Sequence, residues 1–295
     1  MNLRWELTAD SITITDKMAE NINNINWYPG HMAKARRQME EQLKLVDIII
    51  ELRYARIPLA SANPVLAERS KNKPVLIILN KADLADDEQN HKWKEQFDNC
   101  LIVDSTSDNL SRDVIDQIKI ILKDKLERAK ARGIRKKVLR AMVVGIPNVG
   151  KSTFINNIVR KKIAKSENRP GVTRNLQWIK LNEDVELLDT PGVLWPKIED
   201  KKDAVLLALL GSIRDEILDK ELLVNYGLDY IITNYQGLIN RRYEVNEDDT
   251  DLIRSIALNR KWLASNGEPD LNKTIDLILK DIRNNSIGRI TFQKC

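Results

Sequence analysis

Residues 140–159, RAMVVGIPNVGKSTFINNIV, constrain the fold of this chain more than any other segment. An apolar stretch ends at Gly145, a short loop runs to Gly150, and a helical pattern begins at Lys151 and Ser152. The glycines allow backbone N–H groups to close around phosphate oxygens, and the N-terminus of the following helix attracts the same negative charge. The segment therefore predicts a phosphate-binding loop between a strand and a helix. The alternative is a glycine turn with an incidental lysine.

The rest of the chain agrees with this prediction, because short apolar runs alternate with helical patterns as they do in α/β proteins with a mostly parallel sheet. We predict six strands, at residues 46–52, 75–79, 100–104, 140–145, 176–181 and 185–189. From about residue 197 the leucines and isoleucines recur at helical spacing. We therefore expect an N-terminal extension at 1–26, an α/β domain at 27–196 and a smaller helical domain at 197–295.

The residues of the phosphate loop have separate expected roles. Lys151 is expected to reach the β- and γ-phosphates of a nucleotide, and the Ser152 hydroxyl is expected to bind Mg²⁺. The other loop residues expected to contact the nucleotide are Asn148, Val149, Gly150 and Thr153.

A second element expected to sense phosphate is LLDTPG, residues 187–192. Asp189 ends an apolar run and can hold the coordination shell of Mg²⁺, while the amide of Gly192 can bind the γ-phosphate. Between the two motifs, Thr173 in ENRPGVTRN offers a hydroxyl to Mg²⁺ and the γ-phosphate. The alternatives are an ordinary turn at Asp-Thr-Pro-Gly and a surface loop around Thr173.

A third motif, Asn80-Lys81-x-Asp83, follows the apolar run VLIIL. The Asp83 carboxylate can accept two parallel hydrogen bonds from N1–H and the exocyclic amine of guanine, whereas adenine offers no matching donors. Asn80 is expected to brace the base and the neighbouring loop, and the stem of Lys81 is expected to pack along the ring. Ser105 and Thr106 follow the next strand, where a backbone amide can reach the guanine carbonyl oxygen. The alternative for both segments is a polar turn.

The motif Asn80-Lys81-x-Asp83, called the base motif from here on, precedes the phosphate loop. This order is the reverse of that in an ordinary GTPase and indicates a circular permutation. With this order, the chain resembles the ribosome biogenesis GTPase A family of circularly permuted GTPases. The resemblance covers residues 27–290 and rests on the segments WYPGHMAKARRQ, ARIP, NKAD, GIPNVGKST, RPGVT, DTPGVLWP, LLGSIRDEIL and GRITF. It implies a cytoplasmic enzyme that hydrolyses GTP during late assembly of the large (50S) ribosomal subunit, faster on the pre-ribosomal particle. It also implies a helical domain that engages 23S rRNA and a protein that is monomeric off the ribosome.

The catalytic residue is harder to place, because Gly192 is followed by Val193. GTPases usually orient the attacking water with a polar residue here, and valine can neither donate nor accept a hydrogen bond. The resemblance gives this role to His31 of the WYPGHMAK segment, and it makes Asn148 a ligand for K⁺. By its own sequence, His31 opens a helix with one apolar face, and the helix dipole there disfavours the imidazolium form. The alternative is a histidine that only caps a turn; the other histidine, His91, is typical of an exposed helix residue.

The positive charge of the chain is concentrated in its first part. The formal net charge is +5, with 33 basic and 26 acidic residues at 1–196 against 15 and 17 at 197–295. The most basic segment, DKLERAKARGIRKKVLR at 124–140, is either an RNA contact or a solvated helix end.

Cysteine content and hydropathy exclude several classes of protein. The chain has two cysteines, Cys100 and Cys295, without the spacing of a metal site or a disulfide framework, so we expect reduced thiols in a cytosolic protein. No stretch of 18 apolar residues occurs, and the first residues lack the apolar core of a signal peptide. We expect neither secretion nor membrane spanning.

The chain departs from the family pattern at three places. Tyr54 stands where the family usually has aspartate, so any hydrogen bond made by that acid is absent or replaced. Ala62 stands where we expect arginine, which weakens a charged contact near the switch segments. Family members begin close to Trp27, and Met18 offers an internal start, so we expect residues 1–17 to come from an over-long gene model.

Two other functions compete with GTP hydrolysis in ribosome assembly. One is a GTP-gated RNA-binding placeholder without functional turnover, which Val193 favours. The other is a potassium-dependent GTPase domain serving tRNA modification, although no modification-enzyme signature accompanies the motifs.

Overall fold

The chain forms two compact units in a computed structural model. The sheet unit consists of residues 28–196 together with the last three, 293–295, and the helical unit consists of residues 197–292. The structure describes residues 30–64, 73–104, 109–159, 177–192, 194–195, 198–215 and 218–295.

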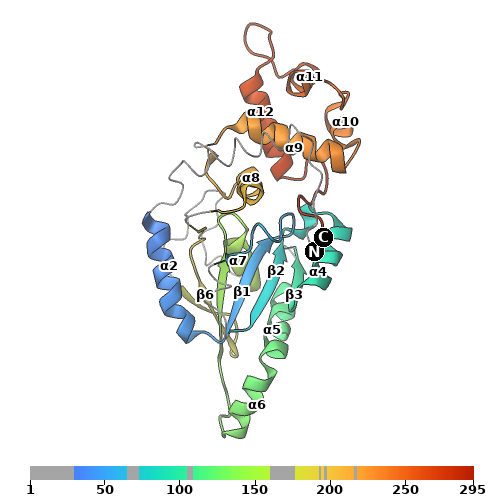
Figure 1. Cartoon of the computed structure of the whole chain (residues 1–295). Coiled ribbons are helices and arrows are strands. Elements are labelled where there is room, and N and C mark those ends of the chain that lie inside the picture. Colours follow the sequence, from blue (N-terminus) through green and yellow to red (C-terminus); the bar gives the residue numbers. More distant parts are fainter. Residues whose placement is uncertain are drawn as a thin grey trace. The chain divides into compact units, whose positions relative to one another are not determined.

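A six-stranded sheet forms the centre of the sheet unit (Figure 1). Its strands follow the apolar runs of the sequence and are β1 (Ile48–Tyr54), β2 (Val75–Asn80), β3 (Cys100–Val103), β4 (Leu139–Gly145), β5 (Gln177–Lys180) and β6 (Val185–Asp189). The strand order is β3-β2-β1-β4-β6-β5. All neighbouring strands are parallel except β5, which pairs antiparallel with β6. The predicted mostly parallel α/β fold is confirmed.

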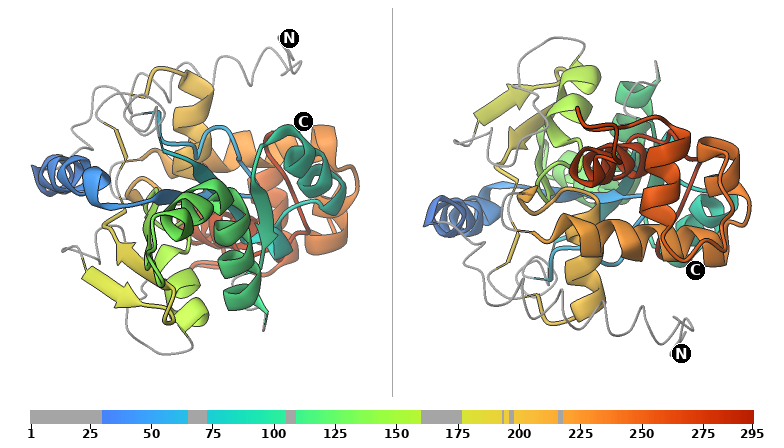
Figure 2. Two further views of the ribbon diagram at one scale, coloured as in Figure 1. Left: turned by 90° about the horizontal axis from the view of Figure 1, so that it is seen from below. Right: turned by 90° about the horizontal axis from the view of Figure 1, so that it is seen from above.

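Helices cover both faces of this sheet (Figure 2). They are α2 (Gly30–Gln42), α4 (Asp87–Gln96), α5 (Leu110–Ile121), α6 (Lys123–Ala131) and α7 (Lys151–Val159), with short 3-10 helices η1 (Leu43–Leu45) and η2 (Ala82–Leu84). Met39 of α2 packs with Met142 and Val144 on one face, in a core cluster continued by Leu43 and Val46. Because side chains alternate along a strand, the buried Val143 faces the other side, where α7 contacts β4 and lies beside α5.

The carboxyl ends of the parallel strands meet at one edge of the sheet. Tyr54 at the end of β1 is in register with Asn80 at the end of β2. On the other side of β1, Leu52 is in register with Gly145, the last residue of β4. This edge therefore brings together the loops that follow β1, β2 and β4, which is the usual place for ligands in open α/β sheets.

The helical unit contains five helices grouped around α9. They are α8 (Lys201–Leu209), α9 (Lys220–Asn234), α10 (Leu238–Tyr243), α11 (Leu252–Asn259) and α12 (Leu271–Arg283). Four of the five begin after an aspartate whose side chain accepts a hydrogen bond from a first-turn amide; these caps are Asp200, Asp219, Asp251 and Asp270. Such caps satisfy amides that have no partner inside the helix, so the sequence itself marks where these helices begin.

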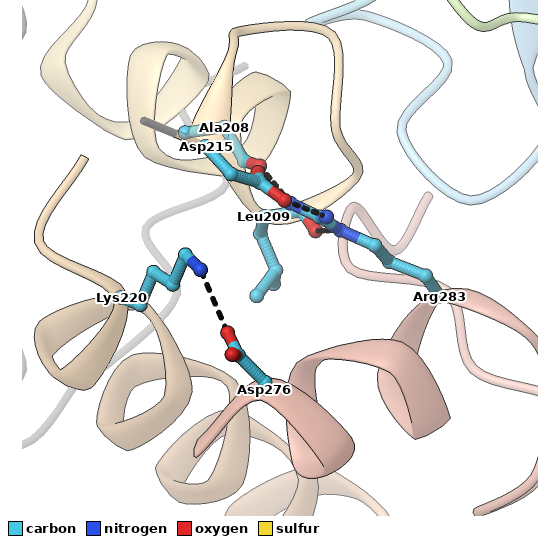
Figure 3. A network of polar contacts seen from close by, with 6 residues as sticks. All are labelled: Ala208, Leu209, Asp215, Lys220, Asp276 and Arg283. Carbon is cyan, nitrogen blue, oxygen red and sulfur yellow. Dashed lines mark hydrogen bonds and ion pairs between the residues drawn. The ribbon is translucent and has the colours of Figure 1, made fainter. Parts of the chain in front are cut away.

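Arg283, at the end of α12, joins three segments of the helical unit (Figure 3). Its guanidinium makes two hydrogen bonds of 2.8 Å to the carboxylate of Asp215. It also donates to the carbonyl oxygens of Ala208 and Leu209, at 3.0 Å and 2.8 Å. Arg283 thus binds the carboxyl end of α8, where the carbonyl of Ala208 also accepts a hydrogen bond from the amide of Gly211 and the helix dipole favours a positive charge.

The chain returns to the sheet unit with its last three residues. The side-chain oxygen of Gln293 accepts hydrogen bonds from the amides of Leu59 (3.0 Å) and Ala60 (2.9 Å). Its backbone carbonyl accepts one from the indole of Trp93 in α4, at 2.8 Å. The amide of Cys295 donates to Gln89 at 2.8 Å. These contacts hold the loop after β1 against the chain end.

Across the described part of the chain, none of the helices is sufficiently long and apolar to cross a membrane.

Candidate nucleotide-binding site

The phosphate loop predicted at residues 145–152 connects β4 to α7. Asn148 and Gly150 both adopt positive φ angles, of 61° and 95°. Gly150 has no room for a side chain, because a Cβ atom there would lie 2.5 Å from the side-chain nitrogen of Asn80. The loop thus needs glycine at this position both for its backbone conformation and for the close approach of Asn80.

Lys151, the first residue of α7, is buried and pairs with Asp189 at the end of β6. The distance from Lys151 Nζ to Asp189 Oδ1 is 3.3 Å, and the two side chains are 6% and 4% exposed. Burial lowers the pKa of Lys151, and the charge of Asp189 opposes this shift. The structure thus brings together the lysine of the phosphate loop and the acid predicted to serve Mg²⁺, although 38 residues separate them in sequence.

The base motif lies directly against the phosphate loop. The side-chain nitrogen of Asn80, which is fully buried, donates to the carbonyl oxygen of Val149 at 2.7 Å. Lys81 Nζ donates to the carbonyl oxygen of Asn148 at 2.9 Å. Asn80 thus holds the phosphate loop, and the base motif and the phosphate loop are in direct contact.

Lys81 combines an unusual backbone conformation with a buried charge. Its φ angle is 56°, in the left-handed region. Burial, assisted by the nearby charge of Arg56, lowers the pKa of Lys81 to about 8, while Asp83 acts in the opposite direction.

Asp83 is exposed and lies in η2, directly after β2. Helix α4 holds the loop around Asp83, because the side-chain nitrogen of Asn90 donates to the carbonyl oxygen of Ala82 at 3.1 Å. The carboxylate predicted to recognise guanine is therefore accessible on a braced turn.

The segment after β6 also reaches the phosphate loop. The hydroxyl of Thr190 donates to the carbonyl oxygen of Val143 at 2.7 Å, which holds this segment to β4. A Cβ atom on Gly192 would lie 3.1 Å from Cα of Pro147 in the phosphate loop. The two predicted phosphate-sensing segments are thus in close contact, and a small residue at 192 allows it.

The donors available for a metal ion at this edge are hard oxygen atoms. Asp189 offers a carboxylate, and Ser152 in the first turn of α7 offers a hydroxyl. No cluster of three or more His, Cys, Asp or Glu side chains suited to a metal occurs among the described residues. Mg²⁺ fits this donor set, because it takes few protein ligands and completes its shell with phosphate oxygens and water.

Several predicted site residues lie outside the described part of the chain. These are Ser105, Thr106 and Thr173, together with Val193. The backbone of His31 lies in the first turn of α2. The structure does not describe the side chain of His31.

Comparisons with known proteins agree with the geometry. The family model of the 50S ribosome-binding GTPase matches residues 140–257. Ribosome biogenesis GTPase A of Bacillus pumilus is 43% identical over 277 residues, which covers 92% of this chain and 98% of that protein. The same enzyme of Priestia megaterium is 45% identical over 276 residues, with coverage of 91% and 96%. The chain belongs to the ribosome biogenesis GTPase A family. Its fold also matches a crystal structure of GNP-bound YlqF from T. maritima, with a TM-score of 0.63, 24% identity and coverage of 88% and 98%.

Membership in the ribosome biogenesis GTPase A family makes this chain a GTPase with a circularly permuted nucleotide-binding domain. Tyr54 also contacts the phosphate loop, which the sequence motifs did not predict. Tyr54 is 3% exposed, and its hydroxyl donates to the carbonyl oxygen of Asn148 at 2.5 Å. The signal in the sequence was a tyrosine two residues after the apolar run at 46–52, which does not reveal its partner.

Proposed function

We propose that this GTPase acts in the cytoplasm during late assembly of the large ribosomal subunit and turns over GTP faster on the pre-ribosomal particle. The observation that supports this best is the contact between the base motif and the phosphate loop. Asn80 bonds to Val149 across 69 residues of sequence, so that one edge of the sheet offers groups for guanine and for phosphates. The relatives are named for ribosome biogenesis, and the 50S ribosome-binding model extends into the helical unit.

The nucleotide contacts follow from this arrangement. Asp83 would accept hydrogen bonds from guanine, and the backbone amides of 148–153 would surround the phosphates. Ser152, Thr173 and Asp189 would hold Mg²⁺, which neutralises charge on the phosphates when it is bound.

The monovalent cation and the attacking water are assigned to two further residues. Asn148 would hold K⁺ close to the phosphates. Val193 leaves the usual water-orienting position apolar, so His31, at the N-terminal end of α2, would orient the water instead.

The helical unit is proposed to engage 23S rRNA, and the protein is proposed to be a monomer off the ribosome. Net charge alone does not favour RNA binding there, since residues 197–295 carry 15 basic and 17 acidic residues. Exposed basic residues such as Arg241 of α10 would make the contacts, whereas the neighbouring Tyr243 is fully buried.

The decisive experiment measures GTP turnover in K⁺ and in Na⁺, with and without immature large subunits. Wild type is compared with His31→Ala, and the control is His91→Ala, which changes the other histidine at an exposed position of α4. We expect turnover in K⁺ to rise with the particle in wild type and in the control. In His31→Ala the stimulated rate should fall by about 100-fold, in the range expected for a group that positions or deprotonates water.

Two results would change the assignment. Full stimulation in His31→Ala would exclude the catalytic role of His31. No stimulation in wild type would favour the placeholder function, in which GTP occupancy rather than turnover controls RNA binding.

A further inference from the structure

The position of Tyr54 in the sheet places it between the two nucleotide motifs. β1 lies between β2, which leads into the base motif, and β4, which leads into the phosphate loop. Tyr54 is the last residue of β1 and is in register with Asn80 of the base motif. A long side chain at this position can therefore reach both loops at once.

Tyr54 and Lys81 converge on one backbone oxygen of the phosphate loop. The carbonyl of Asn148 accepts a hydrogen bond from the Tyr54 hydroxyl at 2.5 Å and another from Lys81 Nζ at 2.9 Å. Lys81 Nζ also lies 3.4 Å from the Tyr54 hydroxyl and 4.8 Å from the centre of its ring. The ring thus supports the lysine while the hydroxyl holds the loop.

The peptide group that is held in this way belongs to a residue that needs external support. Asn148 has a φ angle of 61°, a region that asparagine tolerates better than most residues but that is disfavoured without glycine. Its carbonyl is fixed by Tyr54 and Lys81, and the next carbonyl, that of Val149, is fixed by Asn80. Two consecutive peptide planes of the phosphate loop are therefore oriented by side chains from the end of β1, the end of β2 and the residue that follows β2.

We propose that Tyr54 is a positioning residue that sets the phosphate loop in its binding conformation through the Asn148 carbonyl. This proposal rests on the proposed nucleotide site. The phenolic hydroxyl can donate to a carbonyl oxygen, which a phenyl side chain at the same position could not do.

The test compares wild type with Tyr54→Phe, which removes the hydroxyl and retains the ring beneath Lys81. The matched control is Tyr230→Phe, which removes another buried hydroxyl that donates to a backbone carbonyl, that of Thr291, at 3.0 Å in the helical unit. Dissociation of fluorescently labelled GDP is measured by stopped flow. We expect Tyr54→Phe to accelerate dissociation by about five- to tenfold, which corresponds to one hydrogen bond, and Tyr230→Phe to leave it unchanged.

A second readout separates positioning from general destabilisation and does not need nucleotide. The ¹⁵N chemical shift of the Val149 amide reports on the peptide plane that includes the Asn148 carbonyl. We expect this resonance to shift in Tyr54→Phe and to stay in place in Tyr230→Phe. An unchanged Val149 resonance together with unchanged GDP dissociation would refute the proposal. If wild type failed to bind GDP, the nucleotide assignment would fall, and the Val149 shift would still decide whether Tyr54 orients the loop.

Discussion

At the level of single residues, the proposed specificity for guanine depends on Asp83, an exposed carboxylate on a turn that other side chains hold. Asp83 lies in η2, and the loop around it is held by Asn90 from α4, whose side-chain nitrogen donates to the carbonyl oxygen of Ala82. Because the turn is fixed by groups other than Asp83 itself, a substitution of the carboxylate should change base recognition without collapsing the loop. Discrimination between bases is thus separable from loop structure.

We therefore expect Asp83→Asn to lose affinity for GDP and gain affinity for xanthosine diphosphate, because the amide reverses one donor and acceptor. The loss for GDP should reach about 100-fold, since hydrogen bonds to a charged acceptor contribute about 1.5–3 kcal/mol each. Titration with the two labelled nucleotides measures both effects. Asp87→Asn, at a nearby exposed acid of α4, serves as control. Equal affinity of wild type for GDP and ADP would contradict the role of Asp83.

The strands are the elements that the sequence predicted best. All six apolar runs became strands. The central ones, such as VLIIL of β2, combine β-branched residues with burial on both faces, whereas β5 at the edge of the sheet buries only Ile179. Their order in the sheet was not predictable from the runs themselves. The contact between Tyr54 and Asn148 could therefore not be predicted. It depends on β1 lying between β2 and β4, and neither motif contains that information.

Contacts between distant segments of the helical unit escaped the sequence analysis for the same reason. The aspartate caps are local signals, whereas Arg283 binds Asp215 across 68 residues. The helical spacing of leucines and isoleucines from about residue 197 predicted a helical domain, but it did not identify the side chain that joins the ends of α8 and α12. The motif residues of the nucleotide site were predictable because short local spacing fixes their geometry.

Arg283→Met should destabilise the helical unit by about 2–3 kcal/mol, because it leaves two carbonyls of α8 and the Asp215 carboxylate without their charged donor. Lys220→Met is the matched control, since Lys220 makes an ion pair of 2.7 Å with Asp276 that is more exposed (Figure 3). Its loss should cost less than about 1 kcal/mol. Urea unfolding, with hydrogen exchange in α8 and α12, compares the two variants. Equal losses would show that Arg283 acts as an ordinary surface cation.

At the level of the whole molecule, the chain is unusual in that its last residues belong to the sheet unit. Gln293 holds the amides of Leu59 and Ala60 in the loop that follows β1, close in sequence to Tyr54. The hydroxyl of Ser61 in the same loop accepts a hydrogen bond from the Tyr54 amide at 3.0 Å. The chain end therefore supports a loop that is bonded to the strand end next to the phosphate loop.

Gln293→Leu should free the amides of Leu59 and Ala60, because leucine offers no acceptor in place of the side-chain oxygen. We expect their hydrogen exchange to accelerate by about tenfold, as for amides whose protection depends on a local contact. Exchange measured by NMR at these two residues, with Gln96→Leu at an exposed position of α4 as control, tests this expectation. Unchanged exchange at both amides would mean that the backbone contacts of Gln293 suffice.

The return of the chain also determines how the helical unit is attached. The chain enters this unit shortly after Gly192, which lies against the phosphate loop, and leaves it at Phe292, directly before the residues bound to the loop after β1. Both chain segments that lead to the helical unit are therefore anchored at the edge of the sheet that carries the phosphate loop.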